Sequence, residues 1–166
     1  ESTRKIVRKI NDFSLDAGIL YFENGDPETT VKLYEERYVF IAPKSLTVSK
    51  KKQITWAEVA QIPLCLLTQN MKNRQLIDQH FLELEISPNI VTEASDFTAV
   101  LAQVARGNAA TIAPVSVAET FLDLKSTKQL DLTHPVVTHS VGLSIKDQSP
   151  VLPMIKALRT AVKSAL

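Results

Sequence analysis

Three short polar segments stand at the starts of expected helices, and they are the strongest candidates for chemistry in the sequence. They are Ser2-Thr3, Thr68-Gln69-Asn70 and Ser95-Asp96-Phe97-Thr98, and the last two also follow apolar, strand-like runs. In open α/β sheets, ligands bind outside the carboxyl ends of the strands. A helix that begins there presents free N–H groups and a partial positive charge, which favour an anion. Taken singly, each hydroxyl is explained by capping of its own helix. Taken together, the segments predict one cleft for a small, carboxylate-sized ligand.

The usual sequence signatures of catalysis are absent. The chain has four glycines, and it contains no G-x-G-x-x-G fingerprint, no P-loop and no G-x-S-x-G nucleophile elbow. His80 falls on an apolar helical stripe, where a packed histidine is expected, and His134 and His139 lack the spacing of zinc ligands. Cys65, the single cysteine, lies in an apolar run and is expected to be a buried, inert thiol. The sequence therefore predicts a binding protein without catalytic residues, metal or cofactor.

Length and composition predict a folded domain without a strong charge. The 166 residues suffice for one domain or two small lobes, and 45% hydrophobic residues exclude a disordered chain. Lys and Arg number 19 against 18 Asp and Glu, so no charge excess points to nucleic acid. No apolar stretch approaches the roughly 18 residues that span a bilayer, and no secretory signal is visible. We expect a cytoplasmic protein with no membrane partner.

Strand-like apolar runs alternate with helical stretches along most of the sequence. Strands are expected at residues 15–22, 31–34, 37–42, 63–68, 90–94, 110–114, 129–133 and 136–145. Helices are expected between them: one with its apolar stripe at Ile6, Val7, Ile10 and Phe13, others at residues 56–60, 72–84, 96–106 and 116–124, and a last one after Pro150. Thr55 and Glu58 have the spacing of a capping box, Ser95 is expected to cap the helix at 96–106, and Gly107 to end it. The alternation predicts an α/β fold with mixed, largely parallel sheets.

The order of several short motifs resembles the effector-binding domain of LysR-type transcriptional regulators. The segments that carry the resemblance are LDAGI (15–19), YEERYVFIAP (34–43), ITWAEV (54–59), PLCLL (63–67), VARGNAATIAP (104–114) and the closing helix (150–166). Each motif is short, but their shared order extends over nearly the whole chain. One departure is Asn108-Ala109-Ala110, which replaces the family's usual second glycine and the aliphatic residue after it.

The resemblance implies a two-lobed fold similar to that of type II periplasmic binding proteins. Mapped onto this chain, the first lobe comprises residues 1–66 plus 135–166, and the second comprises residues 67–134. The family binds its effector between the lobes. The implied contact residues are Ser2, Thr3, Thr30, Thr68, Gln69, Asn70, Met71 and Phe97. Met71 and Phe97 are expected to shape selectivity at the mouth of the site, with ordinary packing as the alternative.

The resemblance also implies parts that this sequence does not contain. These are the N-terminal winged helix-turn-helix that reads DNA and the opening strand–helix–strand of the first lobe. DNA binding would then occur only through the absent domain, in a homodimer or homotetramer. Two other functions remain open from the sequence: a solute-binding receptor for transport, and an enzyme of the same fold, such as a dehydratase.

Overall fold

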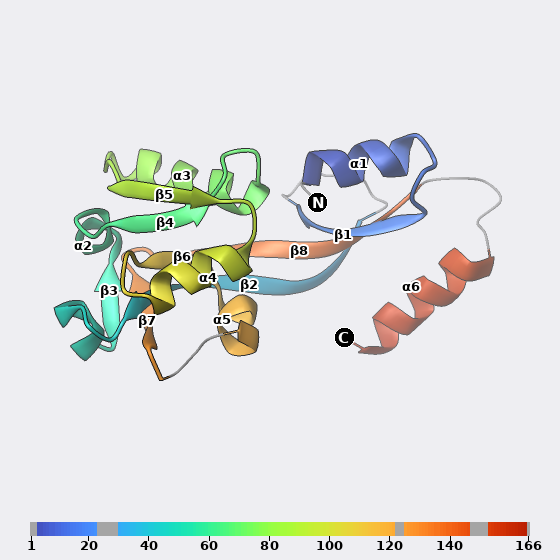
Figure 1. Cartoon of the computed structure of the whole chain (residues 1–166). Helices are drawn as coiled ribbons and strands as arrows, with labels where there is room; N and C mark the ends of the chain where they lie inside the picture. Colours follow the sequence, from blue (N-terminus) through green and yellow to red (C-terminus); the bar gives the residue numbers. More distant parts are fainter. Residues whose placement is uncertain (1–2, 23–29, 122–124, 147–152, 166) are drawn as a thin grey trace. The chain divides into compact units, whose positions relative to one another are not determined.

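The computed structural model describes residues 3–22, 30–121, 125–146 and 153–165. The chain divides into two compact units (Figure 1). The first unit comprises Glu1–Glu35 and His139–Leu166, and the second unit comprises Glu36–Thr138.

Helices and strands both occur along the chain and mostly alternate as expected, which confirms the α/β class, and β3 is a short strand that was not expected. The helices are α1 (Thr3–Asn11), α2 (Trp56–Ala60), α3 (Lys72–Glu83), α4 (Phe97–Ala105), α5 (Val115–Phe121) and α6 (Pro153–Ala165), with a 3-10 turn η1 (Thr47–Lys50). The strands are β1 (Ala17–Phe22), β2 (Thr30–Pro43), β3 (Gln53–Thr55), β4 (Leu64–Leu67), β5 (Ile90–Ala94), β6 (Thr111–Pro114), β7 (Thr127–Thr133) and β8 (Thr138–Ile145). Gly107 ends α4 in the left-handed region, with φ +85°, as expected of a stop signal.

The sheets are mixed in direction. Parallel pairing joins β4 to β5 and β3 to β7. Antiparallel pairing joins β1 to β8, and it joins β2 to both β6 and β7. A parallel bridge between Leu64 and Ala110 connects β4 to the segment that leads into β6. The expectation of mixed sheets is therefore confirmed, but the parallel part is confined to β4 with β5 and β3 with β7, and the other three pairings are antiparallel. The candidate ligand-binding segments begin at the parallel pair β4–β5.

One long strand, β2, replaces the two short strands expected at residues 31–34 and 37–42. The expected break was the acidic pair Glu35-Glu36, but both carboxylates are accommodated within the strand. Ser140 Oγ donates to Glu35 Oε1 at 2.9 Å, and Ser116 Oγ donates to Glu36 Oε2 at 2.7 Å. Glu36 is buried, and this bond supplies the polar partner that a buried carboxylate requires. The strand continues because each charge has a partner.

The boundaries of the compact units lie at residues 35/36 and 138/139. The expected lobes, 1–66 plus 135–166 and 67–134, stay a prediction. Tyr38, Phe40 and Trp56 share one buried cluster with Leu66 and Phe81. Residues 36–66 therefore build the same core as the residues that follow them.

In the first unit, α1 packs on β1 through a close approach at Gly18. A Cβ atom built on Gly18 would lie 2.3 Å from Ile6 Cγ2. The expected apolar stripe of this helix is only partly correct. Ile10 is buried, but Phe13 lies beyond the helix end with φ 64° and is 69% exposed. Its ring is covered on one side by Lys146 Nζ, 3.5 Å from the ring centre, which is a cation–π contact.

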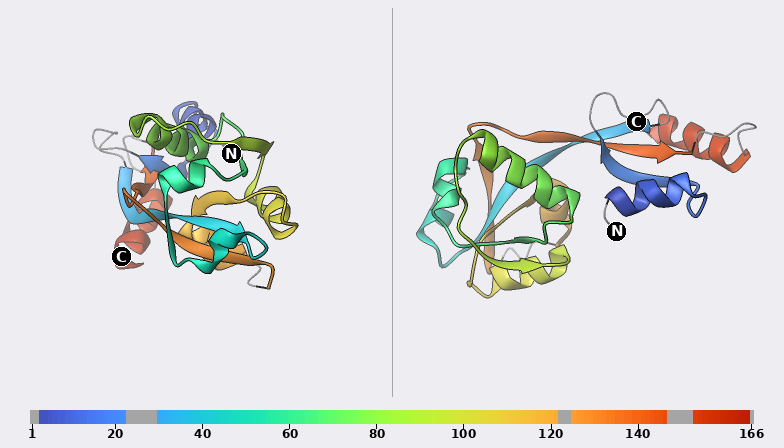
Figure 2. Two further views of the ribbon diagram at one scale, coloured as in Figure 1. Left: turned by 90° about the vertical axis from the view of Figure 1, so that its left-hand side faces the viewer. Right: turned by 90° about the horizontal axis from the view of Figure 1, so that it is seen from above.

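In the second unit, β4 is fully buried, as its continuous apolar sequence predicts. Leu64 and Leu66 belong to the cluster that contains Ile77 and Phe81 of α3. Cys65 and Leu67 belong to the cluster that contains Val100 of α4. Because successive side chains of a strand point to opposite faces, α3 and α4 cover opposite faces of the β4–β5 pair (Figures 1 and 2).

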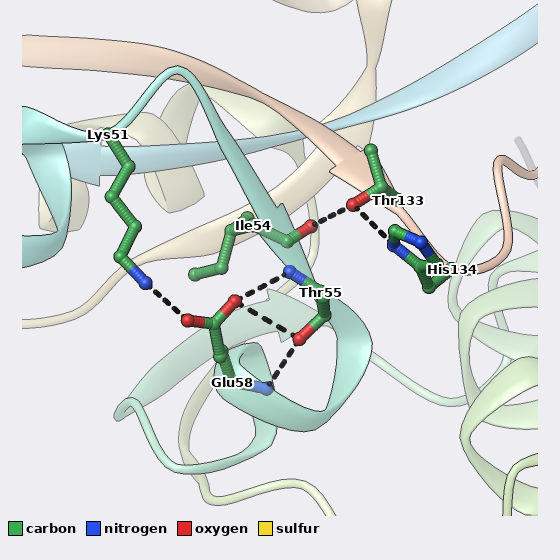
Figure 3. A network of polar contacts seen from close by, with 6 residues as sticks. All are labelled: Lys51, Ile54, Thr55, Glu58, Thr133 and His134. Carbon is green, nitrogen blue, oxygen red and sulfur yellow. Dashed lines mark hydrogen bonds and ion pairs between the residues drawn. The ribbon is translucent and has the colours of Figure 1, made fainter.

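The predicted capping box at the start of α2 is confirmed. Glu58 N–H donates to Thr55 Oγ1 at 3.3 Å, and Thr55 N–H donates to Glu58 Oε2 at 3.0 Å. Lys51 pairs with the other oxygen of the Glu58 carboxylate, and Thr133 Oγ1 donates to the Ile54 carbonyl at 3.2 Å, as Figure 3 shows. The cap places Trp56, which is fully buried, at the first position of the helix.

Candidate functional site

The carboxyl ends of β4 and β5 lie side by side in the second unit. The two strands pair in parallel with Leu67 opposite Ala94, and Thr68 N–H donates to the Ala94 carbonyl at 3.0 Å. The segments that leave these strand ends, residues 68–71 and 95–97, therefore start from one edge of the sheet. Two of the three candidate segments in the sequence are thus brought together.

The segment from Thr68 to Met71 forms a tight polar turn. Thr68 Oγ1 donates to Asn70 Oδ1 at 2.8 Å, and Met71 N–H donates to the Thr68 carbonyl at 3.0 Å. The side chain of Gln75 on α3 holds the turn from outside, since its Nε2 donates to the Gln69 carbonyl at 3.0 Å. Gln69 and Asn70 are exposed, whereas Thr68 and Met71 are half-buried. The turn thus presents polar side chains to solvent at the strand end.

The two helices that start at this edge differ in their N-terminal caps. Asp96 caps α4, since its Oδ1 accepts from Ala99 N–H at 2.9 Å. The expectation that Ser95 caps this helix is wrong: Asp96 is the cap residue, and Ser95 Oγ donates to its carboxylate at 3.4 Å. At α3 the cap residue is Met71, which provides no side-chain hydrogen bond, and its first turn carries no acidic residue. An anion is therefore favoured at the start of α3, because a carboxylate already occupies the start of α4.

Met71 and Phe97 pack on the same apolar cluster beside this edge. Both are half-buried against the group formed by Cys65, Leu67, Val100 and Ala109. Ordinary packing thus accounts for part of each side chain. The role of the two side chains in selectivity stays a prediction.

A buried arginine links the two strand ends from α3. Arg74 is 3% exposed. Its Nη1 donates to the Leu67 carbonyl at 2.8 Å and to Glu93 Oε1 at 2.6 Å, and its Nε donates to Asp78 Oδ1 at 2.7 Å. Burial by itself lowers the pKa of Arg74, but the hydrogen bonds that the guanidinium donates to the carboxylates of Asp78 and Glu93 outweigh it and raise the pKa above its ordinary value. The guanidinium therefore remains a fixed cation.

The remaining predicted contact residues belong to the first unit. Thr3 is the first residue of α1, and Thr30 is the first residue of β2. Ser2 lies outside the described residues. A Cβ atom built on Gly142 of β8 would lie 2.8 Å from Thr30 Cγ2, so the Thr30 methyl group packs closely over this strand. A contribution of Ser2, Thr3 and Thr30 to ligand binding stays a prediction.

Two residues whose types could support catalysis, Cys65 and His80, have packing roles in the second unit. Cys65 is buried, and burial raises the pKa of its thiol, which disfavours the nucleophilic thiolate. The His80 ring lies 5.7 Å from the Trp56 ring, and its Nδ1 lies 3.2 Å from Glu83 Oε2, so it is a packed histidine at the helix rim. Among the described residues, no group of three His, Cys, Asp or Glu side chains is arranged to hold a metal ion. No helix in the described part of the chain is long and apolar enough to cross a membrane.

The sequence reasoning missed Arg74 and Glu93. A signal for Arg74 was present, because it shares a helical stripe with Ile77 and Phe81 at spacings of three and seven residues, and so occurs on the buried face. An arginine on an apolar stripe requires fixed acidic or carbonyl partners. Glu93 had no comparable signal, since it is an exposed residue on an edge strand.

Comparison with known proteins agrees with this architecture. The family model of the LysR substrate binding domain matches residues 1–166. The effector-binding domain of QuiR in complex with shikimate is 20% identical, with a TM-score of 0.81, and the match covers 98% of this chain and 77% of that one. The regulatory domain of Synechocystis PCC6803 CcmR in complex with 2-PG is 10% identical, with a TM-score of 0.86, over 99% and 79% of the chains.

A longer relative has the same fold. Full-length CbnR complexed with its target DNA is 18% identical, with a TM-score of 0.80, and the match covers 99% of this chain but 55% of that one. This chain therefore spans about half the length of that regulator. No curated protein sequence matches the chain.

Proposed function

Because the chain belongs to the LysR substrate-binding domain family, the ligand-sensing regulatory domain of LysR-type transcriptional regulators, we propose that it binds a small anionic metabolite at the start of α3. The observation that carries this proposal is the combination at one sheet edge of adjacent strand ends and a helix start without a side-chain cap. Thr68, Gln69 and Asn70 supply the polar contacts, and Met71 and Phe97 supply the apolar ones.

The backbone amides of α3 provide the attraction for the anion. The first N–H groups of a helix have no partner within the helix and carry a partial positive charge. A bound carboxylate or phosphate would accept hydrogen bonds from them, and the Thr68 hydroxyl would turn from Asn70 toward the ligand. Two proteins of the same fold support a small-molecule ligand: the effector-binding domain of QuiR is in complex with shikimate, and the regulatory domain of CcmR is in complex with 2-PG.

We propose that ligand binding regulates transcription by favouring one arrangement of a homodimer or homotetramer. A ligand shifts such an equilibrium only by its difference in affinity for the two states. DNA contact would be made by a winged helix-turn-helix domain outside this chain, and the regulator would act in the cytoplasm. Family membership favours this function over a transport receptor or an enzyme of the same fold.

A thermal-shift screen tests the proposal. Trp56 is the single tryptophan and is fully buried in the second unit, so its fluorescence reports the unfolding of this unit. Small carboxylates and phosphate esters, beginning with shikimate and 2-PG, should include one that raises the transition temperature, because a ligand at about 100 times its Kd stabilises the native state by about 2.7 kcal/mol.

The variant Thr68→Val then tests the site. It should weaken the identified ligand by roughly 1–2 kcal/mol, the cost of leaving a buried acceptor unpaired, which is about a five- to thirtyfold increase in Kd. Thr92→Val, on the exposed part of β5, is the matched control and should leave Kd unchanged. Equal affinity of the Thr68→Val variant and the wild type, measured by calorimetry, would remove Thr68 from the site.

A further inference from the structure

We infer that Arg74 is a positioning residue for the ligand-binding edge, holding the ends of β4 and β5 and the turns that follow them in one fixed arrangement. The inference rests on the proposed function in that the turns it holds are those proposed to contact the ligand. Arg74 lies on α3, yet its guanidinium reaches the last residue of β4 and the next-to-last residue of β5.

The planar guanidinium group of Arg74 donates three hydrogen bonds. Nη1 bridges the Leu67 carbonyl, which immediately precedes Thr68, and the Glu93 carboxylate, which immediately precedes Ala94. Ala94 in turn accepts the hydrogen bond of Thr68 N–H. The guanidinium and this backbone bond therefore connect the same two strand ends at adjacent positions. Asp78 fixes the orientation of the group from one helical turn further along α3.

Burial assigns Arg74 to support of the edge and not to direct ligand contact. Its side chain is 4% exposed, whereas its two acidic partners, Asp78 and Glu93, are 39% and 40% exposed. Removal of this cation would deprive the Asp78 and Glu93 carboxylates and the Leu67 carbonyl of their shared guanidinium donor. The strands that it joins are short, four residues in β4 and five in β5.

Lysine cannot replace this arrangement. The arginine fork donates in several fixed directions, and lysine offers a compact point charge on a flexible stem. Arg74→Lys should keep the charge near Asp78 and Glu93 but lose the simultaneous bond to the Leu67 carbonyl. Arg74→Met should lose both the charge and the link while retaining an apolar stem of similar length.

Amide hydrogen exchange of the ligand-free chain tests the inference. Two backbone amides near β4 serve as reporters. Thr68 N–H donates to the Ala94 carbonyl, between the strand ends that Arg74 connects. Cys65 N–H donates to the Ala110 carbonyl at 2.9 Å, on the other side of β4. In Arg74→Met, exchange at Thr68 should accelerate at least about tenfold relative to Cys65, because local opening at the strand end becomes easier. Arg74→Lys should lie between this variant and the wild type.

The matched control is Gln75→Ala, which removes another side-chain bond from α3 to the same turn, to the exposed Gln69 carbonyl. It should leave the ratio of the two exchange rates within about twofold of wild type. A uniform acceleration of both amides in Arg74→Met would show a general stabilising role and overturn the inference. The exchange experiment uses no ligand, so its result is independent of the thermal-shift screen. A screen that finds no stabilising ligand would count against the proposed function alone.

Discussion

The capping box at the start of α2 gives a prediction whose size follows from the structure. Thr55→Ala removes the hydroxyl that accepts from Glu58 N–H, in a cap that positions the buried Trp56. Loss of an N-cap hydroxyl costs about 1 kcal/mol. Urea unfolding of a domain this size has a slope of about 1–3 kcal/mol per molar. The midpoint followed by Trp56 fluorescence should therefore fall by about 0.5 M.

The ion pair within the same network should matter less than the cap. The side chains of Lys51 and Glu58 are 52% and 41% exposed, so water screens their attraction. Lys51→Met is expected to cost less than about 0.5 kcal/mol. A larger loss for Lys51→Met than for Thr55→Ala would refute the reasoning, because it would assign the stability to the exposed charges instead of the backbone cap.

The pH dependence of unfolding stability separates the contribution of the Glu58 charge from that of the capping hydrogen bonds at the start of α2. The hydrogen bond from Lys51, followed by that from Thr55 N–H, lowers the pKa of Glu58 from 4.5 to about 2. A lowered folded-state pKa contributes stability above pH 4.5 and loses it as the pH falls toward 2. Glu58→Gln retains a capping-box residue but not the charge. The stability difference between wild type and this variant should shrink between pH 4.5 and 2, and a difference that grows in this window would contradict the assignment.

Three further predictions concern other parts of the chain. Gly18→Ala should destabilise the first unit by about 1–3 kcal/mol through overpacking against Ile6, and amide exchange in β1 should become faster. Ile6→Ala should relieve most of this added cost, so stability losses that simply add in the double variant would contradict the clash. Cys65 should react with a thiol reagent only in urea, because it is fully buried and its pKa is raised; fast native labelling would refute this. Ser116→Ala should cost about 1–3 kcal/mol, because the buried Glu36 carboxylate loses its hydroxyl donor; a change within about 0.5 kcal/mol, the range of an ordinary surface substitution, would show that water replaces the donor.

Much of the fold could be predicted from local patterns. The capping box, the apolar run at β4 and the stop at Gly107 are signals carried by a few adjacent residues, and the structure bears out each of them. The continuation of β2 through Glu36 depends instead on a partner distant in sequence, because nothing local shows that Ser116 satisfies this carboxylate.

The candidate site divides in the same way. The rule that ligands bind at the carboxyl ends of strands predicts that Thr68 and Ser95 lie near each other, and the parallel pairing of β4 with β5 brings their segments to one edge. Which of the two helix starts favours an anion could not be predicted from the sequence. Ser95 and Asp96 are both residue types that cap helices, and only the structure shows that the Asp96 carboxylate occupies the start of α4. The Arg74 link depends on Glu93, 19 residues away, and no local pattern predicts such a partner.

Anion binding at the start of α3, beside the paired ends of β4 and β5, can be mapped by NMR from the chemical shifts of backbone amides. During titration with the ligand that the thermal screen identifies, we expect the largest shifts at residues 68–74 and 95–97, with the amides at the start of α3 moving as expected for hydrogen bonding to an anion. Shifts confined to other parts of the second unit, with the start of α3 unchanged, would contradict it.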